Sequence, residues 1–264
     1  MSKFKHSLSV IVPVYNEDKI LNDTIENLYY SLQKFSSDFE FLIIENGSID
    51  NTYKIAKSLE SGFPNIKTVH LKEPNYGNAL REGIRLSSKK YTVNFSIDFI
   101  DLNFLNTAMS ISHNYDLIIG SKRIGSGDNR PKYRKLGTLA YNFILSFFIS
   151  MPFKDTHGLK LYNTEIAQKY EKQTISKSLV FDEELIYRIY KSGHKINEIG
   201  VSVKEVSSPR TGILSRAFEV IVNLYYLYNI HLLNNSYYIQ IRQYVYCIIN
   251  LLLYSFFYLL VLHF

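Results

Sequence analysis

A buried strand that runs into a polar turn opens the chain at residues 9–17 (SVIVPVYNE). Its apolar residues are mostly β-branched, which is typical of a parallel strand covered on both faces. Pro13 has no N–H to donate, so we expect it to end the ladder. Tyr15, Asn16 and Glu17 then lie beyond the carboxyl end of the strand, where open α/β sheets bind ligands. An ordinary first strand of an α/β domain has the same pattern, so the remainder of the chain decides between the two interpretations.

Further apolar runs alternate with helical patterns through the first half of the chain. We expect five strands, at residues 8–14, 39–44, 66–71, 91–96 and 115–120. Residues 18–35 carry apolar side chains at helical spacing between the first two. This alternation predicts an α/β fold with a mainly parallel central sheet. Polar loops come after the first, second and fourth strands, so we expect them to gather at one edge of the sheet.

The second half is less regular. We expect a helix, a turn that enters a short strand, a second helix and a last strand, at residues 134–150, 155–162, 179–192 and 195–203. A basic cluster at residues 120–135 holds six cationic residues against one acid: Lys122, Arg123, Arg130, Lys132, Arg134 and Lys135, with Asp128. Arginine binds phosphate through a planar fork, which suggests a phosphate site. A solvated surface loop is the alternative.

The C-terminal fifth of the chain is strongly apolar. Residues 213–233 are apolar over most of a helical circumference, which fits either packing within the protein or a membrane interface. Residues 244–264 contain no Asp, Glu, Lys or Arg and as a helix would span about 30 Å, the thickness of a hydrocarbon core. We therefore expect an α/β domain at 1–212, an amphipathic segment at 213–239 and a single transmembrane helix at 240–264. A buried C-terminal helix is the alternative.

The net charge and the cysteine content restrict the kinds of partner and of metal site that we expect. The net charge of +6 suits an anionic partner, such as nucleic acid, a membrane surface or a phosphorylated substrate. The basic residues that precede the apolar C-terminus favour a cytoplasmic domain. No apolar stretch comes after Met1, so we expect no signal peptide. A single cysteine, Cys247, excludes an internal disulfide and a cysteine-rich metal site.

Four motifs in this order resemble those of family 2 glycosyltransferases, which have the GT-A fold. Residues 9–17 resemble the opening strand and P-x-Y-N-E turn of the family. Residues 45–52 (ENGSIDNT) resemble its D-D-G-S-x-D-x-T turn, and residues 75–83 resemble its N-x-G region with shortened spacing. Residues 96–98 (SID) stand where a D-x-D motif is expected. The resemblance covers about residues 8–212.

Within the family, the chain resembles the dolichyl-phosphate mannosyltransferase and polyprenyl-phosphate glycosyltransferase branch. The matching stretches are 120–123 (GSKR), Arg134, Asn142, 155–160 (DTHGLK), 181–184 (FDEE) and 208–212 (SPRTG). The resemblance implies an inverting enzyme that moves a hexose from a nucleotide-sugar to polyprenyl (dolichyl-type) phosphate at the cytoplasmic membrane face. It implies no nucleic-acid partner.

The resemblance also implies roles for particular residues. The wall of the base and ribose pocket is expected from Pro13, Tyr15 and Glu17, and base contacts from Glu45 and Asn46. Arg123 and Arg134 are expected to hold the acceptor phosphate or the diphosphate, and Arg210 to close over the diphosphate. For Glu45 a solvated turn acid is the alternative.

A divalent cation, Mg²⁺ or Mn²⁺, is implied at the leaving diphosphate, with Asp98 as its principal ligand and Asp101 as a second oxygen donor. Helix capping is the alternative role for Asp98. The usual acids are replaced at Asn46 and Ser96, so the resemblance implies a weakly bound ion.

The acceptor determines whether a base is needed. A phosphate monoester is already ionised at neutral pH, since its second pKa is about 6. A sugar hydroxyl would need a carboxylate, for which Asp182 and Glu183 are candidates. These acids also suit the N-terminal turn of a helix. Two rival functions remain open: a glycosyltransferase acting on a glycan or glycolipid hydroxyl, and a non-catalytic nucleotide-sugar-binding protein that has lost acids at Asn46 and Ser96.

Overall fold

A computed structural model describes residues 6–36, 38–122, 124, 151–153, 158–176 and 180–201. The chain divides into two compact units, residues 1–142 with 152–208 and residues 143–151 with 209–264. The described strands and helices all belong to the first unit. Among the described residues no helix is long and apolar enough to cross a membrane. The expected segments at 213–239 and 240–264, and the expected helix at 134–150, lie outside the described residues.

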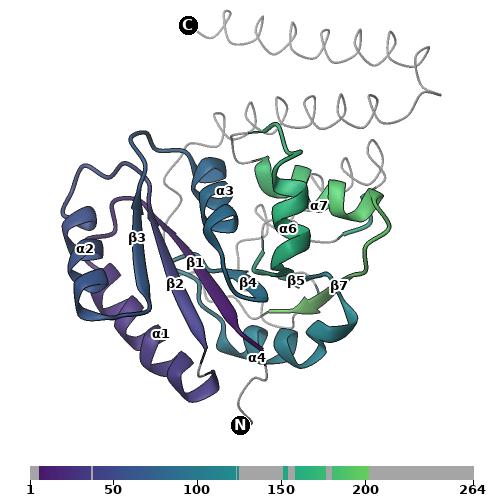
Figure 1. Ribbon diagram of the computed structural model, residues 1–264, viewed down its shortest axis with the longest axis horizontal. Helices are drawn as coiled ribbons and strands as arrows, with labels where there is room; N and C mark the ends of the chain where they lie inside the picture. Colours follow the sequence, from purple (N-terminus) through teal and green to yellow (C-terminus); the bar gives the residue numbers. More distant parts are fainter. Residues whose placement is uncertain are drawn as a thin grey trace, which may run out of the picture. The chain divides into compact units, whose positions relative to one another are not determined.

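The described part of the first unit is built on one seven-stranded sheet in the order β3-β2-β1-β4-β6-β5-β7 (Figure 1). Its strands are β1 (Leu8–Val14), β2 (Phe39–Glu45), β3 (Ile66–His70), β4 (Tyr91–Asn94), β5 (Leu117–Ser121), β6 (Lys160–Asn163) and β7 (Ile196–Gly200). Every neighbouring pair is parallel except those of β6, which runs antiparallel to both β4 and β5. The expected mainly parallel α/β sheet is confirmed.

Helices alternate with the parallel strands. They are α1 (Leu21–Phe35), α2 (Thr52–Gly62), α3 (Tyr76–Leu86), α4 (Leu102–Ile111), α6 (Thr164–Glu171) and α7 (Phe181–Lys191), with a 3₁₀ turn at Ser112–Asn114. Two expected strands prove shorter. The strand expected at 91–96 ends at Asn94 because Ser96 pairs with Phe99 in a tight turn, and the strand expected at 195–203 ends at Gly200.

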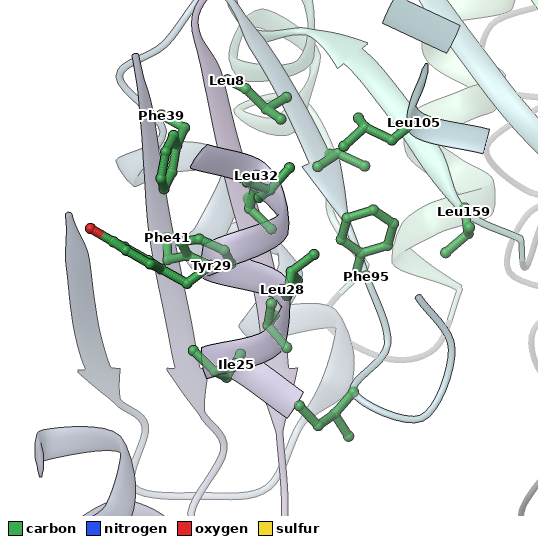
Figure 2. Packing of buried hydrophobic residues seen from close by; sticks show 14 of the residues in the cluster. Leu8, Ile25, Leu28, Tyr29, Leu32, Phe39, Phe41, Phe95, Leu105 and Leu159 are labelled. Atoms are coloured by element: carbon green, nitrogen blue, oxygen red, sulfur yellow. The ribbon is translucent and has the colours of Figure 1, made fainter. Parts of the chain in front are cut away.

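Alternate residues of β1 divide between the two faces of the sheet. Val10 and Val12 belong to the main apolar cluster, which also contains the buried residues of α1 and α4. Figure 2 shows Leu28 and Leu32 of α1 packed in this cluster with residues of the sheet. Ile11 lies between these two residues in the strand, so its side chain points to the other face of the sheet, where it lies against α3. Helices therefore cover both faces, and the sheet edge is left for a site.

Pro13 ends the ladder on one side of β1 only. Pairing with β4 stops at Ile11, whose carbonyl accepts from Phe95 N–H at 2.9 Å. Pairing with β2 continues through Pro13 to Val14. The backbone N–H and C=O groups of residues 11 and 13 point toward the same neighbouring strand, β4. The N–H that Pro13 lacks would therefore have pointed toward β4. The expectation that Pro13 ends the ladder therefore holds for the β4 side alone, and β1 extends to Val14 as expected.

Gly83 of α3 lies against Ile11 of β1. A Cβ added at Gly83 would stand 2.4 Å from Cγ2 of Ile11, far inside contact distance. Only a residue without a side chain lets α3 approach the sheet this closely. This approach fixes the start of α3 at the carboxyl edge of β1 and β2.

We expect Gly83→Ala to lower the free energy of unfolding by about 1–3 kcal/mol, because the methyl group overpacks the helix against Ile11. Urea unfolding of the full chain measures the change. Gly62→Ala is the matched control, since a Cβ at the end of α2 would meet nothing within 4 Å. Equal effects of the two substitutions would contradict close α3 packing as the cause.

Candidate active site

The loops after β1 and β2 are hydrogen-bonded to each other. Asn16 N–H donates to Oγ of Ser48 at 3.0 Å, and Oδ1 of Asn16 accepts from Ile49 N–H at 3.0 Å. Glu17 N–H donates to Oγ1 of Thr52 at 2.7 Å. Asn16 adopts φ +54°, a left-handed conformation that asparagine tolerates better than most residues. The predicted gathering of polar loops at one edge of the sheet is confirmed, and hydrogen bonds hold these two loops together.

Asp50 also holds the loops after β1 and β2 together. Its Oδ1 accepts from Thr52 N–H at 2.9 Å, and its Oδ2 accepts from Asp18 N–H at 3.3 Å. Desolvation raises the pKa of Asp50, but hydrogen bonds from the hydroxyl and N–H of Thr52 and from Asp18 outweigh it, so the pKa lies below 3.8. A lowered folded-state pKa means that the carboxylate stabilises the loops above its unfolded pKa and that this contribution is lost as pH falls through the folded value.

Glu45, the last residue of β2, is completely buried. Its Oε1 accepts from Ser48 N–H at 2.6 Å, and its Oε2 lies 2.5 Å from Nδ1 of His70, its neighbour in register on β3. The alternative of a solvated turn acid was wrong, because the carboxylate is enclosed between two strand ends. The contact between Glu45 and the nucleotide base stays a prediction. The base would have to share carboxylate oxygens that already bind Ser48 N–H and His70.

Asn46 joins the loop after β2 to the start of α3. It is 7% exposed, and its Oδ1 accepts from Asn75 N–H at 2.7 Å. Asn75 in turn caps α3 by accepting from Asn78 N–H at 3.0 Å. Gly47, at φ +72°, lies so close to the backbone of residues 72–74 that a Cβ would be 3.2 Å away. The loops after β1, β2 and β3 therefore form one connected platform.

The turn after β4 presents Asp98 to solvent. Asp98 is exposed, and Ser96 Oγ donates to its Oδ1 at 2.5 Å. Capping of the next helix falls to Asp101, whose Oδ1 accepts from the N–H groups of Asn103 and Phe104 at 2.9 Å each. The alternative capping role for Asp98 was wrong. Asp101 as a metal ligand stays a prediction, with one of its oxygens already engaged.

A buried polar cluster lies at the same edge, where β6 begins opposite the end of β4. It consists of four residues, Asn94, Lys160, Tyr162 and Asp182. Lys160 is completely buried, and its Nζ donates to Asp182 Oδ2 and to the carbonyl of Gly158, both at 2.9 Å. Oδ1 of Asn94 accepts from Lys160 N–H at 3.1 Å, and Tyr162 donates to Asp182 at 3.4 Å.

Tyr76, the first residue of α3, lies near this buried polar cluster, close enough for the charge of Asp182 to act on its hydroxyl. Burial raises the pKa of Tyr76 well above 10, and the nearby charges of Asp182 and Glu183 raise it further. Burial and Asp182 raise the pKa of Tyr162 in the same way. Both phenols therefore stay protonated at neutral pH.

The three consecutive acids of α7 lie in its first turn, as expected, but all are buried. Asp182 pairs with Lys160, and Glu184 accepts from Arg188 and from the N–H groups of Ile175 and Ser176. Glu183 is completely buried and contributes to the field around the Tyr76 hydroxyl. A helix terminus favours acids by its dipole, yet here the side-chain partners are what make burial tolerable.

Arg81 of α3 holds the segment that leads into α7. Its guanidinium pairs with Glu171 at 2.9 Å and donates to the carbonyls of Thr174 and Ser176 at 2.8 and 2.7 Å. It also lies 5.0 Å from the ring centroid of Phe181. This set of contacts fixes the acidic turn of α7 relative to α3.

The remaining predicted site residues can be placed only in part. Pro13, Tyr15 and Glu17 lie at the carboxyl edge of β1 and are partly exposed. Arg123, Arg134 and Arg210 lie outside the described residues, so their phosphate contacts stay predictions. No three His, Cys, Asp or Glu side chains of the described residues are grouped closely enough to hold a metal ion by themselves.

A polar platform at the carboxyl ends of the strands is where open α/β sheets bind their ligands. Residues 9–171 match the family described as glycosyl transferase family 2, and the chain belongs to this family. The resemblance inferred from the sequence is confirmed, and the protein is a glycosyltransferase.

Two curated relatives are glycosyltransferases. The chain is 28% identical to dolichyl-phosphate beta-glucosyltransferase of Dictyostelium discoideum over 81% of this chain and 71% of that protein. It is 25% identical to glycosyltransferase AglD of Haloferax volcanii, over 74% of this chain and 32% of that protein.

Solved structures share the fold. Glucosyl-3-phosphoglycerate synthase of Mycobacterium tuberculosis, in complex with Mn²⁺, UDP and phosphoglyceric acid, superposes with a TM-score of 0.61 at 15% identity, covering 85% of this chain and 79% of that one. Mannosyl-3-phosphoglycerate synthase of Rubrobacter xylanophilus gives a TM-score of 0.59 at 13% identity, covering 83% and 72%. At these identities the similarity is evidence for the GT-A-like fold.

The ion pair between Lys160 and Asp182 yields a stability prediction. Lys160→Met should lower the free energy of unfolding by about 3–5 kcal/mol, because it leaves the Asp182 carboxylate buried without its cation. The double variant Lys160→Met with Asp182→Asn should be less destabilised than Lys160→Met alone, since no unpaired charge remains. Denaturant unfolding of the two single variants and the double variant gives the coupling energy. Strictly additive effects would contradict a direct charge pair.

Proposed function

We propose that this protein transfers a hexose from a nucleotide-sugar to polyprenyl phosphate at a membrane surface, with inversion at the anomeric carbon. An oxygen of the lipid phosphate attacks that carbon, the bond from the carbon to the diphosphate oxygen breaks, and the nucleoside diphosphate leaves. The relative from Dictyostelium discoideum, a dolichyl-phosphate beta-glucosyltransferase, supports this acceptor class.

The state of Asp182 is the observation that carries the proposal. A hydroxyl acceptor needs a carboxylate that can take its proton. Asp182 holds the ammonium of Lys160 at 2.9 Å in a site where both side chains are almost completely buried. If Asp182 took up a proton, Lys160 would remain as a buried cation without a counter-charge, which is costly. Asp182 is thus poorly suited to act as a base, whereas an ionised phosphate acceptor requires none.

The connected loops supply the donor site in this proposal. Pro13, Tyr15 and Glu17 line the base and ribose, and the platform that carries Glu45 and Asn46 holds them in place. Because hydrogen bonds already fix these loops, the site is ordered before the donor arrives, and little ordering entropy is lost on binding. Asp98 stands at the diphosphate end.

A divalent cation fits the oxygen donors of this site. Mg²⁺ and Mn²⁺ bind carboxylates together with substrate phosphate oxygens, so one protein carboxylate and the donor diphosphate suffice. Asp98 is the exposed carboxylate for this role, and Mn²⁺ is present with UDP in the mycobacterial synthase of the same fold. When bound, the ion would neutralise charge on the leaving diphosphate.

The acceptor side rests on residues implied by the family resemblance. Arg123 and Arg134 would hold the lipid phosphate, and Arg210 would close over the diphosphate. Residues 213–239 would lie at the membrane interface and residues 240–264 would span the bilayer, with the catalytic domain on the cytoplasmic side.

Arg134→Ala should reduce transfer to polyprenyl phosphate by roughly 30-fold to several thousand-fold, because a desolvated phosphate loses a charge-assisted partner. Glu183→Gln should change the rate by less than about threefold, since an ionised acceptor needs no base. The rates are measured with detergent-solubilised full-length enzyme, and nucleotide affinity serves as the control for both variants.

Asp182→Asn belongs in the same series, because Asp182 is the second candidate base. Its rate is compared with that of Lys160→Met, which disturbs the same ion pair without removing a carboxylate, so that loss of structure is separated from loss of a base. A fall of about 10²–10⁴-fold in Glu183→Gln, with Arg134→Ala still active, would establish the hydroxyl acceptor instead.

A further inference from the structure

We infer that His70 contacts the nucleotide base of the donor, with its Nε2 accepting a hydrogen bond from a ring N–H of the base. The inference rests on the proposed function for the class of donor. It adds the residue that selects among nucleotides, and it favours a base with a ring N–H, such as uracil or guanine, over cytosine or adenine. It makes no use of the acceptor or of a metal ion.

His70 lies at the edge of the sheet where the donor base is expected. It is the last residue of β3, in register with Glu45 of β2, which is in register with Val14 of β1. These three strands lie side by side (Figure 1). Residues in register on neighbouring strands direct their side chains to the same face of a sheet. The imidazole therefore belongs to the row of strand ends that leads into Tyr15.

One side of the imidazole is held inside the protein. Nδ1 of His70 lies 2.5 Å from Oε2 of Glu45, whose side chain is completely buried. The ring also packs against that of Tyr53, with centroids 4.7 Å apart and an angle of 43° between the planes. A ring held by two contacts loses little conformational entropy when it meets a ligand. This role was not predicted from the sequence, because Glu45 lies 25 residues away.

The other side of the imidazole is open. The His70 side chain is 43% exposed although its partner carboxylate is enclosed. Within the described part of the chain, no residue is hydrogen-bonded to Nε2. A carboxylate only accepts hydrogen bonds, so the contact with Glu45 assigns a proton to Nδ1, and in the neutral ring Nε2 is then an acceptor. His70 thus offers a ligand one acceptor whose orientation the protein has fixed.

His194 shows the opposite arrangement at the other end of the sheet, just before β7. It also pairs with an acid, since its Nδ1 lies 3.0 Å from Oδ2 of Asp116. Its Nε2, however, is hydrogen-bonded to the hydroxyl of Tyr170 at 3.1 Å. Both ring nitrogens of His194 therefore serve the fold, whereas His70 uses only one of its nitrogens in this way.

The position and charge of the site favour the base over the diphosphate at His70. Three strand spacings, about 14 Å, separate β3 from β4, whose turn carries Asp98. The ribose separates the base of a donor from its diphosphate, so the two parts can meet different strands. Directly behind the imidazole lies the Glu45 carboxylate, which repels an anionic group. A neutral base therefore suits this position better than a phosphate.

The acceptor at Nε2 also distinguishes between bases. Uracil and guanine carry a hydrogen on the ring nitrogen of their hydrogen-bonding edge. In cytosine and adenine the corresponding ring nitrogen is itself an acceptor, so it would face Nε2 without a hydrogen between them. A site built to hydrogen-bond one group rejects the analogue that lacks it.

Nucleotide binding tests the inference. We compare the affinities of UDP, CDP, GDP and ADP, by calorimetry with the full chain at pH 8, where an imidazole is ordinarily neutral. Within the pair that binds more tightly, pyrimidines or purines, wild type should favour the nucleotide with the ring N–H by about tenfold. His70→Phe keeps a ring beside Tyr53 but has no nitrogen, so this preference should fall to within about threefold. His70→Gln, which restores an acceptor oxygen, should show a larger preference than His70→Phe.

His194→Phe is the matched control, because it removes a histidine that is paired with an acid far from the proposed base site. It should leave the preference unchanged. The inference would be overturned, and the proposed function would stand, if wild type bound these nucleotides without preference or preferred CDP or ADP. An unchanged preference in His70→Phe, or an equal loss of preference in His194→Phe, would overturn it as well. Failure of wild type to bind any of the four nucleotides would overturn the donor half of the proposed function together with this inference.

Discussion

A buried ion pair between Lys160 and Asp182 is the constraint on which the catalytic edge of the sheet depends. Lys160 begins β6, and Asp182 lies in the first turn of α7, so the 2.9 Å contact joins the sheet to the helix that carries three acids. β6 runs antiparallel beside β4, which places Lys160 at the carboxyl end of β4, in register with Asn94. The ion pair and the pairing of β6 with β4 therefore meet at the same edge of the sheet.

A second set of contacts makes the edge rigid. The loops after β1 and β2 exchange hydrogen bonds, Asn46 carries the connection on to α3, and Gly83 lets α3 lie directly on β1. The two aspartates expected from the family resemblance in the turn after β2 are Glu45 and Asn46 here, so one carboxylate is kept and one is lost. These replacements form bonds within the protein, so the platform is held by contacts that do not depend on a bound ion.

Much of the fold could be predicted from local pattern. Runs of β-branched residues between helical repeats were enough to predict a mainly parallel sheet, and polar turns after the strands located the site. A short strand was also expected within residues 155–162, but the antiparallel direction of β6 could not be predicted from these residues. Its direction is set by pairing with β4 and β5, which are distant in sequence.

The chemistry of the site was less predictable than its position. Glu45 and the acids of α7 have the composition of solvated turns and helix ends, yet they are buried because partners reach them from elsewhere. His70 lies 25 residues after Glu45, and Lys160 lies 22 residues before Asp182. Spacing in the sequence carries no information about such pairs.

The central claim is that the site serves an acceptor that arrives already ionised. The most direct measurement incubates the purified full-length protein with a panel of nucleotide-sugars and either polyprenyl phosphate or the matching polyprenol, and analyses the extracted lipid by mass spectrometry. The account predicts one added hexose on polyprenyl phosphate, with one nucleotide-sugar strongly preferred, and no product from the polyprenol. Transfer to the polyprenol, or to a glycan hydroxyl while polyprenyl phosphate stays unmodified, would contradict it.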